Sequence, residues 1–359
     1  MANVLDLRRR IRSVKSTRQI TKAMKMISAA RLRRAQERAV SARPYARSMA
    51  AVLESLRHRI EIFDPATGNL RHPLFITRPE KRVLLVVVSG DKGFAGAFNA
   101  NIMKAATQFF EGNTDKQIDV EAIGRKARDL LRRRHPAAHY ETQPEGTTQR
   151  PVRLRQEGIV GTIEVTGDHP GLLDKPVSSR VFLLASELIA RYVHEEIDAC
   201  YVVYNEFKSV IQQRVIVERL LPLMVIGKSE VSGSLAPSAA EREQAGEAAL
   251  SAGLSLEPVD TTETDEEAKK FGTANVDYIY EQPAEELFND LLPQYVSSML
   301  YHAITESVAA EHAARMTAMD SATNNASDMI DAYTLQMNRL RQAAITKEII
   351  EIVSGAAAV

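Results

Sequence analysis

Residues 284–359 carry a hydrophobic repeat whose steps alternate between three and four residues, which is typical of one long helix in a coiled coil. At 1.5 Å per residue this helix is roughly 100 Å long, more than a compact domain of this size needs. Pro293 predicts a kink near its start. Many side chains at the repeat positions are small or weakly polar, which suits a second helix that packs closely but is held weakly. The repeat positions, called the C-terminal seam, are Phe288, Leu291, Tyr295, Ser298, His302, Thr305, Ala309, His312, Met316, Met319, Thr323, Ala326, Ile330, Tyr333, Met337, Leu340 and Ala344.

A second long helical segment is predicted over residues 1–59. Its apolar stripe begins with Val4, Leu7, Ile11 and Val14, and then resumes one residue out of phase with Ile20, Met24 and Ile27. This step predicts a local discontinuity in helix winding. Pro44 predicts a bend, after which the helix resumes to about Arg59. Two helices from opposite ends of the chain, paired with each other, predict a shaft that carries a domain between them.

The middle of the chain alternates strand and helix patterns, which predicts a layered α/β domain over about 80–225. The run 82–88 is β-branched and ends at Ser89-Gly90, as expected of a buried parallel strand. The other expected strands are 118–123, 158–165, 199–206 and 209–221, and the expected helices are 97–111, 125–134 and 178–196.

Two shorter segments separate this domain from the C-terminal helix. Residues 228–275 are rich in Ser, Ala, Glu, Gly and Thr, which predicts a flexible insert. Residues 276–283 form a short predicted strand that stops at Pro283. The C-terminal helix is expected to start just beyond it and to occupy 284–359.

Charge is zero overall but unevenly distributed. Residues 1–47 hold fourteen Lys and Arg against two acids, a net charge of +12, whereas residues 284–359 carry −6. Opposite charges favour pairing of the two helices, and the surplus positive charge needs another partner. Nucleic acid and anionic lipid are alternatives to an acidic protein surface, but no aromatic residue precedes Tyr45 to stack on bases. The single cysteine, Cys200, excludes an intramolecular disulfide.

Possible catalytic and ligand motifs are weak. The loop Gly90–Gly96 follows a strand, as phosphate-binding loops do, but its spacing is not the dinucleotide fingerprint. Gly227-Lys228-Ser229 lacks the upstream glycine of a P-loop. The two seam histidines, His302 and His312, are too far apart for one metal, and no catalytic set is evident. Two alternatives stay open from the residues alone: a coiled-coil adaptor carrying a nucleotide-binding α/β module, and a basic nucleic-acid-binding helix protein.

Several longer motifs resemble the γ subunit of F-type ATP synthases. At the N-terminus they are Ser13–Met26 (SVKSTRQITKAMKM) and Arg31–Gln36 (RLRRAQ). At the C-terminus they are Ala314–Ala326 (ARMTAMDSATNNA) and Asn338–Ile349 (NRLRQAAITKEI), which leads into Ile352–Val359 (IVSGAAAV). The loop Ser89–Gly96 and Asn99 resemble the central domain of that family. The resemblance covers nearly the whole chain except 228–275.

This resemblance implies a central rotating stalk that has no catalytic activity of its own. Its terminal helices would form an antiparallel coiled coil inside a ring of α and β subunits, which bind Mg-ATP and Mg-ADP. Its α/β domain would contact the ε subunit and the c-ring on the membrane side. The chain would then lie on the cytoplasmic face of a bacterial inner membrane, attached only through the complex, and would bind no nucleic acid and no cofactor.

The resemblance also assigns roles to individual positions. Those expected to contact the β subunit are Lys22, Met24, Lys25, Arg315, Met319, Arg341 and Gln342. Those expected to fill an apolar bearing at the tip are Ile345, Ile349, Ile352 and Val353. Those expected to form a foot against the c-ring and ε are Tyr278, Tyr280 and Glu281. The insert lies where photosynthetic relatives carry a regulatory segment, but without cysteine it cannot be a thiol switch. Deleting 232–270 should leave assembly intact, and raised ATP hydrolysis would indicate a brake.

Overall fold

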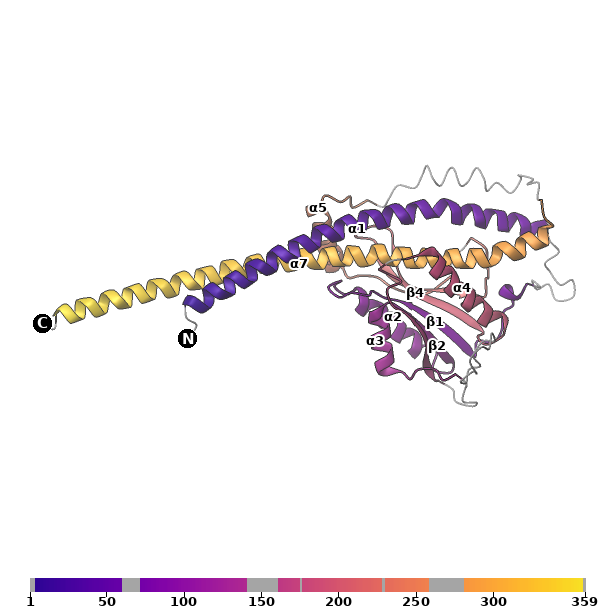
Figure 1. Cartoon of the computed structure of the whole chain (residues 1–359), viewed down its shortest axis with the longest axis horizontal. Coiled ribbons are helices and arrows are strands. Elements are labelled where there is room, and N and C mark those ends of the chain that lie inside the picture. Colours follow the sequence, from indigo (N-terminus) through magenta and orange to yellow (C-terminus); the bar gives the residue numbers. More distant parts are fainter. Residues whose placement is uncertain are drawn as a thin grey trace, which may run out of the picture.

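The computed structural model describes residues 4–59, 72–140, 161–174, 176–227, 230–257 and 281–357. Two long helices, α1 (Val4–Arg59) and α7 (Ala284–Ala357), form a shaft beside a smaller α/β domain, as Figure 1 shows. The mixed α/β class with a shaft of terminal helices is therefore confirmed. None of the helices within these ranges is long and apolar enough to cross a membrane.

The α/β domain is built on one six-stranded sheet with the order β3-β2-β1-β4-β5-β6. The strands β1 (Arg82–Val88), β2 (Gln117–Ile123), β3 (Ile163–His169) and β4 (Ala199–Phe207) are parallel. The strands β5 (Gln213–Leu221) and β6 (Glu230–Leu235) are antiparallel additions at one edge. The central strand β1 is almost wholly buried because helices cover both faces of the sheet, which explains its continuous apolar run.

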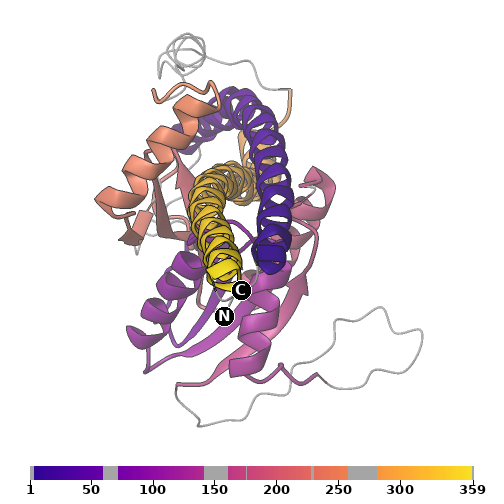
Figure 2. The same ribbon diagram turned by 90° about the vertical axis from the view of Figure 1, so that its left-hand side faces the viewer.

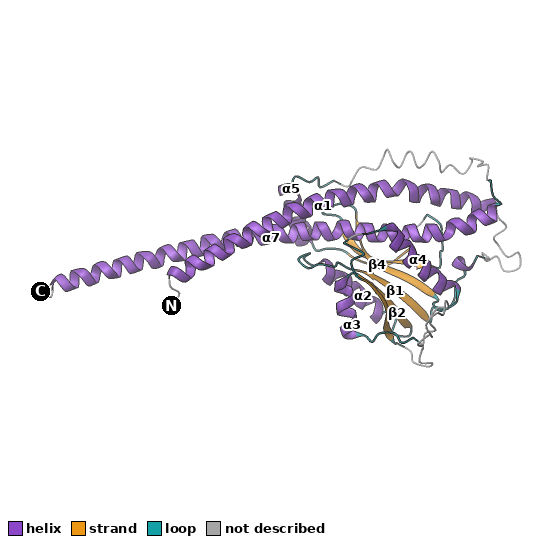
Figure 3. Ribbon diagram, in the orientation of Figure 1, coloured by secondary structure: helices purple, strands orange, loops and turns teal. Residues whose placement is uncertain are grey.

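Helices α2 (Phe98–Glu111) and α3 (Arg125–Arg134) lie on one face of the sheet, and α4 (Ser178–Val193) lies on the other, together with the shaft. A short 3-10 helix, Pro73–Phe75, precedes β1. Figure 3 shows the strands gathered beneath the paired helices. Most of the expected strands and helices of this domain are found within a few residues. Strand β5 starts at Gln213 because residues 208–212 form a turn. The strand expected over 158–165 begins outside the described residues, and β3 extends from Ile163 to His169.

The shaft is an antiparallel pair. Thr323 Oγ1 donates to Thr21 Oγ1 (2.8 Å) and Lys25 Nζ donates to Asp320 Oδ1 (2.5 Å), so rising numbers on α1 meet falling numbers on α7. This register brings Val4 level with about residue 340 of α7, and the last turns of α7 project beyond α1. Both helices continue through their prolines: α1 is unbroken at Pro44 and α7 at Pro293.

The expected discontinuity in the α1 seam is wrong. The buried or half-buried positions keep alternating steps of three and four residues through the region where a phase shift was expected, because polar residues occupy the seam there. Ile20 and Ile27, which suggested the shift, are 57% and 56% exposed. The observed seam is Leu7, Ile11, Val14, Arg18, Thr21, Lys25, Ser28, Leu32, Ala35 and Ala39.

The expectation of a flexible insert over 228–275 is wrong for its described part, 230–257. Strand β6 pairs with β5, and helix α5 (Ala239–Ser251) packs against α7. A capping box starts α5, because Ser238 Oγ accepts from Glu241 N (3.3 Å) and the Glu241 carboxylate accepts from Ser238 N (2.7 Å). Figure 2, which looks along the shaft, shows α5 beside the two long helices.

Candidate functional site

The projecting end of α7 is the most exposed part of the shaft. Every residue from Arg341 to Ser354 is exposed, although the stretch is rich in isoleucine. The expected bearing residues lie here: Ile345, Ile349, Ile352 and Val353 are between 48% and 70% exposed. Arg341 and Gln342 are exposed at the start of the same stretch. An apolar helical end without cover in the isolated chain is a surface suited to a partner.

Basic side chains cover the outer side of α1. Those that are exposed are Arg8, Arg9, Arg10, Arg12, Lys15, Lys22, Arg31, Arg33, Arg34, Arg38 and Arg47. Arg10 pairs with Asp6 of its own helix (3.2 Å), and Arg31 lies 3.9 Å from Asp174. Exposed pairs of this kind neutralise little of the local potential. The surface therefore suits an acidic partner.

Of the three neighbouring residues expected to face β, the structure leaves only Lys22 fully exposed. Met24 is half-buried, and Lys25 is 9% exposed in the seam. Lys25 Nζ bonds both Asp320 of α7 and Ser251 Oγ at the end of α5 (2.7 Å). The expectation that Lys25 carries surplus charge is corrected, because this ammonium is neutralised within the chain.

Arg315 and Met319, expected to contact β from the other helix, are also buried. Met319 packs within the shaft, whereas Arg315 points to the α/β domain. Its Nη2 donates to Glu311 Oε1 (2.6 Å) and to the Gly93 carbonyl (3.4 Å). The guanidinium of Arg315 is thus paired inside the chain. Whether either residue also touches a partner stays a prediction.

The Gly90–Gly96 loop ends β1 at the place where ligands bind in open α/β sheets, but α7 occupies that place. A Cβ on Gly90 would lie 2.7 Å from Glu311 Oε1. The loop is also held by Asn99, whose Oδ1 accepts from Gly90 N (2.9 Å), and by Asp91, whose Oδ1 accepts from Gly171 N (2.7 Å). A buried carboxyl group in this crevice disfavours phosphate, so the geometry argues against a nucleotide site here.

The electrostatics of this contact follow from burial. Burial raises the pKa of Glu311, and the neighbouring Arg315 guanidinium opposes that shift. Burial, with Arg315 and Arg31 nearby, lowers the pKa of His312 to about 4, so this imidazole is neutral at physiological pH. Arg315 Nη1 lies 3.4 Å from His312 Nδ1, where a neutral ring can accept.

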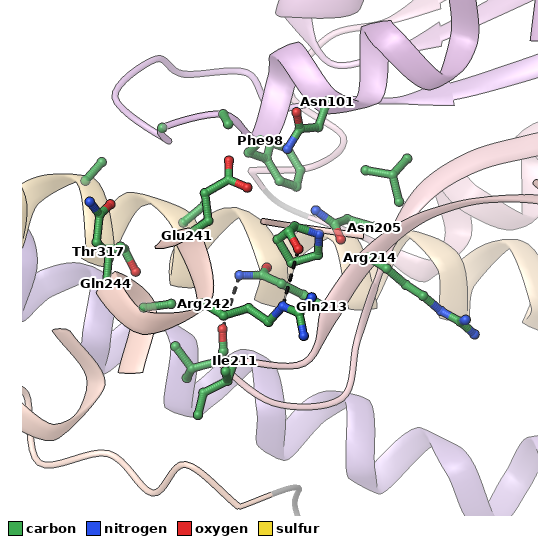
Figure 4. A pocket seen from close by; sticks show the side chains of 18 of the residues that line it. Phe98, Asn101, Asn205, Ile211, Gln213, Arg214, Glu241, Arg242, Gln244 and Thr317 are labelled. Carbon is green, nitrogen blue, oxygen red and sulfur yellow. Dashed lines mark hydrogen bonds between the residues drawn. The ribbon is translucent and has the colours of Figure 1, made fainter. Parts of the chain in front are cut away.

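A cavity of about 310 Å³ lies where the insert, the shaft and the α/β domain meet. Figure 4 shows Phe98 and Asn101 of α2, Glu241 and Arg242 of α5, and Thr317 of α7 around it. Arg242 is tied to the Pro237 carbonyl (3.3 Å). The lining comes from all three parts, so the described part of the insert closes one side of a cleft between the shaft and the domain.

The expected foot lies mostly outside the described residues. Tyr278 and Tyr280 lie outside the described residues, as do residues 276–280 of the strand expected over 276–283. Residues 281–283 are not in a strand, and Glu281 is exposed just before α7. Sequence reasoning missed the buried polar residues that join α7 to the sheet, among them Glu306 and Ser307. Both follow Thr305, a position on the C-terminal seam, and a heptad pattern does not indicate whether a helix has a second buried face.

Comparison with known proteins places the chain in a family. A sequence model described as ATP synthase matches residues 3–359. The ATP synthase gamma chain of Solibacter usitatus is 43% identical over 358 residues, covering 100% of this chain and 99% of that protein. The ATP synthase gamma chain of Pelotomaculum thermopropionicum is 38% identical, covering 100% and 99%.

A solved structure agrees in fold. One chain of the Euglena gracilis mitochondrial ATP synthase (OSCP/F1/c-ring, rotational state 3) matches with a TM-score of 0.52 at 17% identity, covering 99% of this chain and 94% of that chain. This likeness shows the fold alone, whereas the full-length identity to the bacterial proteins shows kinship. The chain therefore belongs to the family of ATP synthase gamma chains.

Proposed function

We propose that the chain is the central rotating shaft of an F-type ATP synthase, coupling ion flow through a membrane c-ring to conformational cycling of the catalytic β subunits. The observation that carries this is full-length kinship combined with a two-helix shaft whose apolar end projects from the α/β domain. An asymmetric shaft that turns inside a ring stabilises different conformations of the surrounding sites in turn, and so shifts their populations.

Specific contacts belong to this proposal. Arg341 and Gln342 would bond a loop of β, and Ile345, Ile349, Ile352 and Val353 would turn in an apolar bearing. Lys22 and the exposed arginines of α1 would face acidic segments of β. Tyr278, Tyr280 and Glu281 would meet the c-ring and ε. The exposure of the tip and of the basic surface supports the first three assignments.

Catalysis would belong to the partners. Mg-ATP and Mg-ADP would bind to the α and β subunits, and this chain would hold no cofactor. It would be peripheral, on the cytoplasmic face of the bacterial inner membrane, attached only through the complex. The adaptor alternative loses support because Glu311 lies in the crevice that its nucleotide would need.

The test is reconstitution with purified α and β subunits, followed by observation of rotation. Lys104 on α2 is exposed, so Lys104→Cys offers a thiol for attaching a bead. Cys200 is fully buried and burial raises its pKa to about 12, so it should not react. One copy of the chain per six ring subunits, with the bead turning in ATP, is the expected result. A ring that hydrolyses ATP without turning the bead would overturn the proposal.

A further inference from the structure

Helix α7 is joined to the sheet by buried hydrogen bonds from two adjacent residues. Ser307 Oγ accepts from the backbone N–H of Asn205 (3.1 Å), and Glu306 Oε2 accepts from that of Phe207 (3.4 Å). Both acceptors bind the C-terminal part of β4, a strand paired with the central strand β1. Ser307 is 0% exposed and Glu306 is 5% exposed. The shaft is thus fastened directly to the rigid centre of the domain.

One turn further along α7, a second pair fastens the loop after β1. Arg315 bonds Glu311 and also reaches the Gly93 carbonyl through Nε and Nη2, each at 3.4 Å. Gly90 approaches Glu311 so closely that no side chain fits between them. Four residues spread over about two and a half turns of α7 thus contact the sheet and the loop after β1. They are called the junction: Glu306, Ser307, Glu311 and Arg315.

Helix α1 is attached to the domain more loosely. Its Arg31 lies 3.9 Å from Asp174, and the two side chains are 49% and 34% exposed. Lys25 and Arg33 bond Ser251 and the Gly253 carbonyl, which belong to the insert rather than to the four parallel strands. Exposed pairs with long separations resist displacement weakly, whereas buried and fully paired groups hold one geometry.

We propose that torque passes from the α/β domain into the shaft through α7 at the junction, and that α1 is turned by α7 rather than by the domain. This inference rests on the proposed rotary function. When two connections share a torque, the stiffer one carries most of it, and here that is the connection through α7. The four junction residues therefore act as positioning residues that fix the angle between the domain and the shaft. The coiled-coil seam then carries the twist from α7 to α1.

The experiment measures the angular fluctuation of a bead on Lys104→Cys while the ring is stalled without ATP. The junction variant is Glu311→Gln with Arg315→Met, which removes both charges together and leaves no unpaired charge buried. Ser307→Ala is a milder variant that removes one hydrogen bond without a cavity. The matched controls, Arg31→Gln and Ser251→Ala, break the links of α1 instead. Thermal unfolding of each variant shows whether the fold is kept.

The junction variants should raise the angular variance of the bead, the double variant by about twofold and Ser307→Ala by less, because each lost buried contact loosens one attachment. The controls should leave the variance unchanged. A folded junction variant with unchanged variance, or controls that raise it equally, would overturn the inference. A wild-type chain that never turns in ATP would instead remove the proposed function, and the inference with it.

Discussion

At the scale of single residues, Gly124 shows how one backbone position sets a loop. It joins β2 to α3 with φ +87°, and a Cβ there would lie 2.1 Å from the Ser89 carbonyl oxygen. Ser89 in turn accepts from Ala127 N (2.7 Å) through its hydroxyl, which fastens the start of α3 to the end of β1. Only glycine meets both the conformational and the steric demand.

Gly124→Ala should therefore destabilise the chain by about 2 kcal/mol or more, because strain and backbone overlap add. Urea denaturation followed by circular dichroism measures this. Gly93→Ala, in the neighbouring loop after β1, is the control: nothing lies within 4 Å of a Cβ there, and the chain should tolerate the change. Equal losses in both variants would show that the Gly124 contact is not the cause.

His312 should make the chain acid-sensitive. Its folded-state pKa, about 4, lies below the ordinary value of 6.5, so the unfolded chain binds a proton more readily. This contribution to stability is full above pH 6.5 and is lost as pH falls towards 4, by up to about 3 kcal/mol. Unfolding of wild type and of His312→Gln, compared at pH 7 and pH 4.5, should show a smaller loss in the variant. Equal losses would assign the acid sensitivity to other groups.

At the scale of elements, α5 is a short helix whose place depends on small residues. Ala245, Gly246, Ala248 and Ala249 are buried, while Glu243 and Glu247 are exposed. Lys25 extends from the α1 seam to bond Ser251, which ties the C-terminal end of α5 to both long helices. The element is held by close approach rather than by large apolar side chains.

Ala248→Leu should displace α5, because extra methyl groups in a packed contact cost about 1–3 kcal/mol. Limited trypsin digestion should then cut sooner after Arg242, a residue within α5. Ala240→Leu, on the exposed side of the same helix, is the control and should leave the digestion rate unchanged. A similar rate in both variants would mean that α5 is not held through Ala248.

At the scale of the whole molecule, the shaft ends in a single helix with exposed apolar side chains. The last turns of α7 lie beyond α1 and expose isoleucines that the domain does not cover. Removing these isoleucine side chains should change the unfolding free energy of the isolated chain little, because they are exposed. Their purpose, under the proposed function, is realised only inside a ring.

Ile349→Ser with Ile352→Ser should leave the unfolding free energy within about 0.5 kcal/mol of wild type, because both side chains are exposed. Light scattering should show less self-association, since the apolar surface is reduced. Binding to the ring should weaken. Lys347→Ser, on the same exposed stretch, is the control and should alter self-association little. A large loss of stability in the double variant would mean that the tip packs on the chain itself.

Much of this architecture was predictable because its signals are local. The alternation of strands and helices and the heptad steps after Phe288 each depend on periodicity within one segment, and these elements are where they were expected. The α1 seam was misread because Thr21, Lys25 and Ser28 are polar, and a pattern built on apolar positions passes over them. Helix α5 was missed because the prediction for the insert depended on its composition alone.

The sequence by itself determined the two long helices, the parallel strands, the uneven charge and the family, because periodicity, composition or motifs indicate each of them. Only the tertiary structure decided which charges are free. Lys25 resembles a surplus cation in the sequence, yet folding brings Asp320 to it. It also decided that Glu311 fills the crevice of the glycine loop. These outcomes depend on contacts between segments hundreds of residues apart, and no local pattern records them.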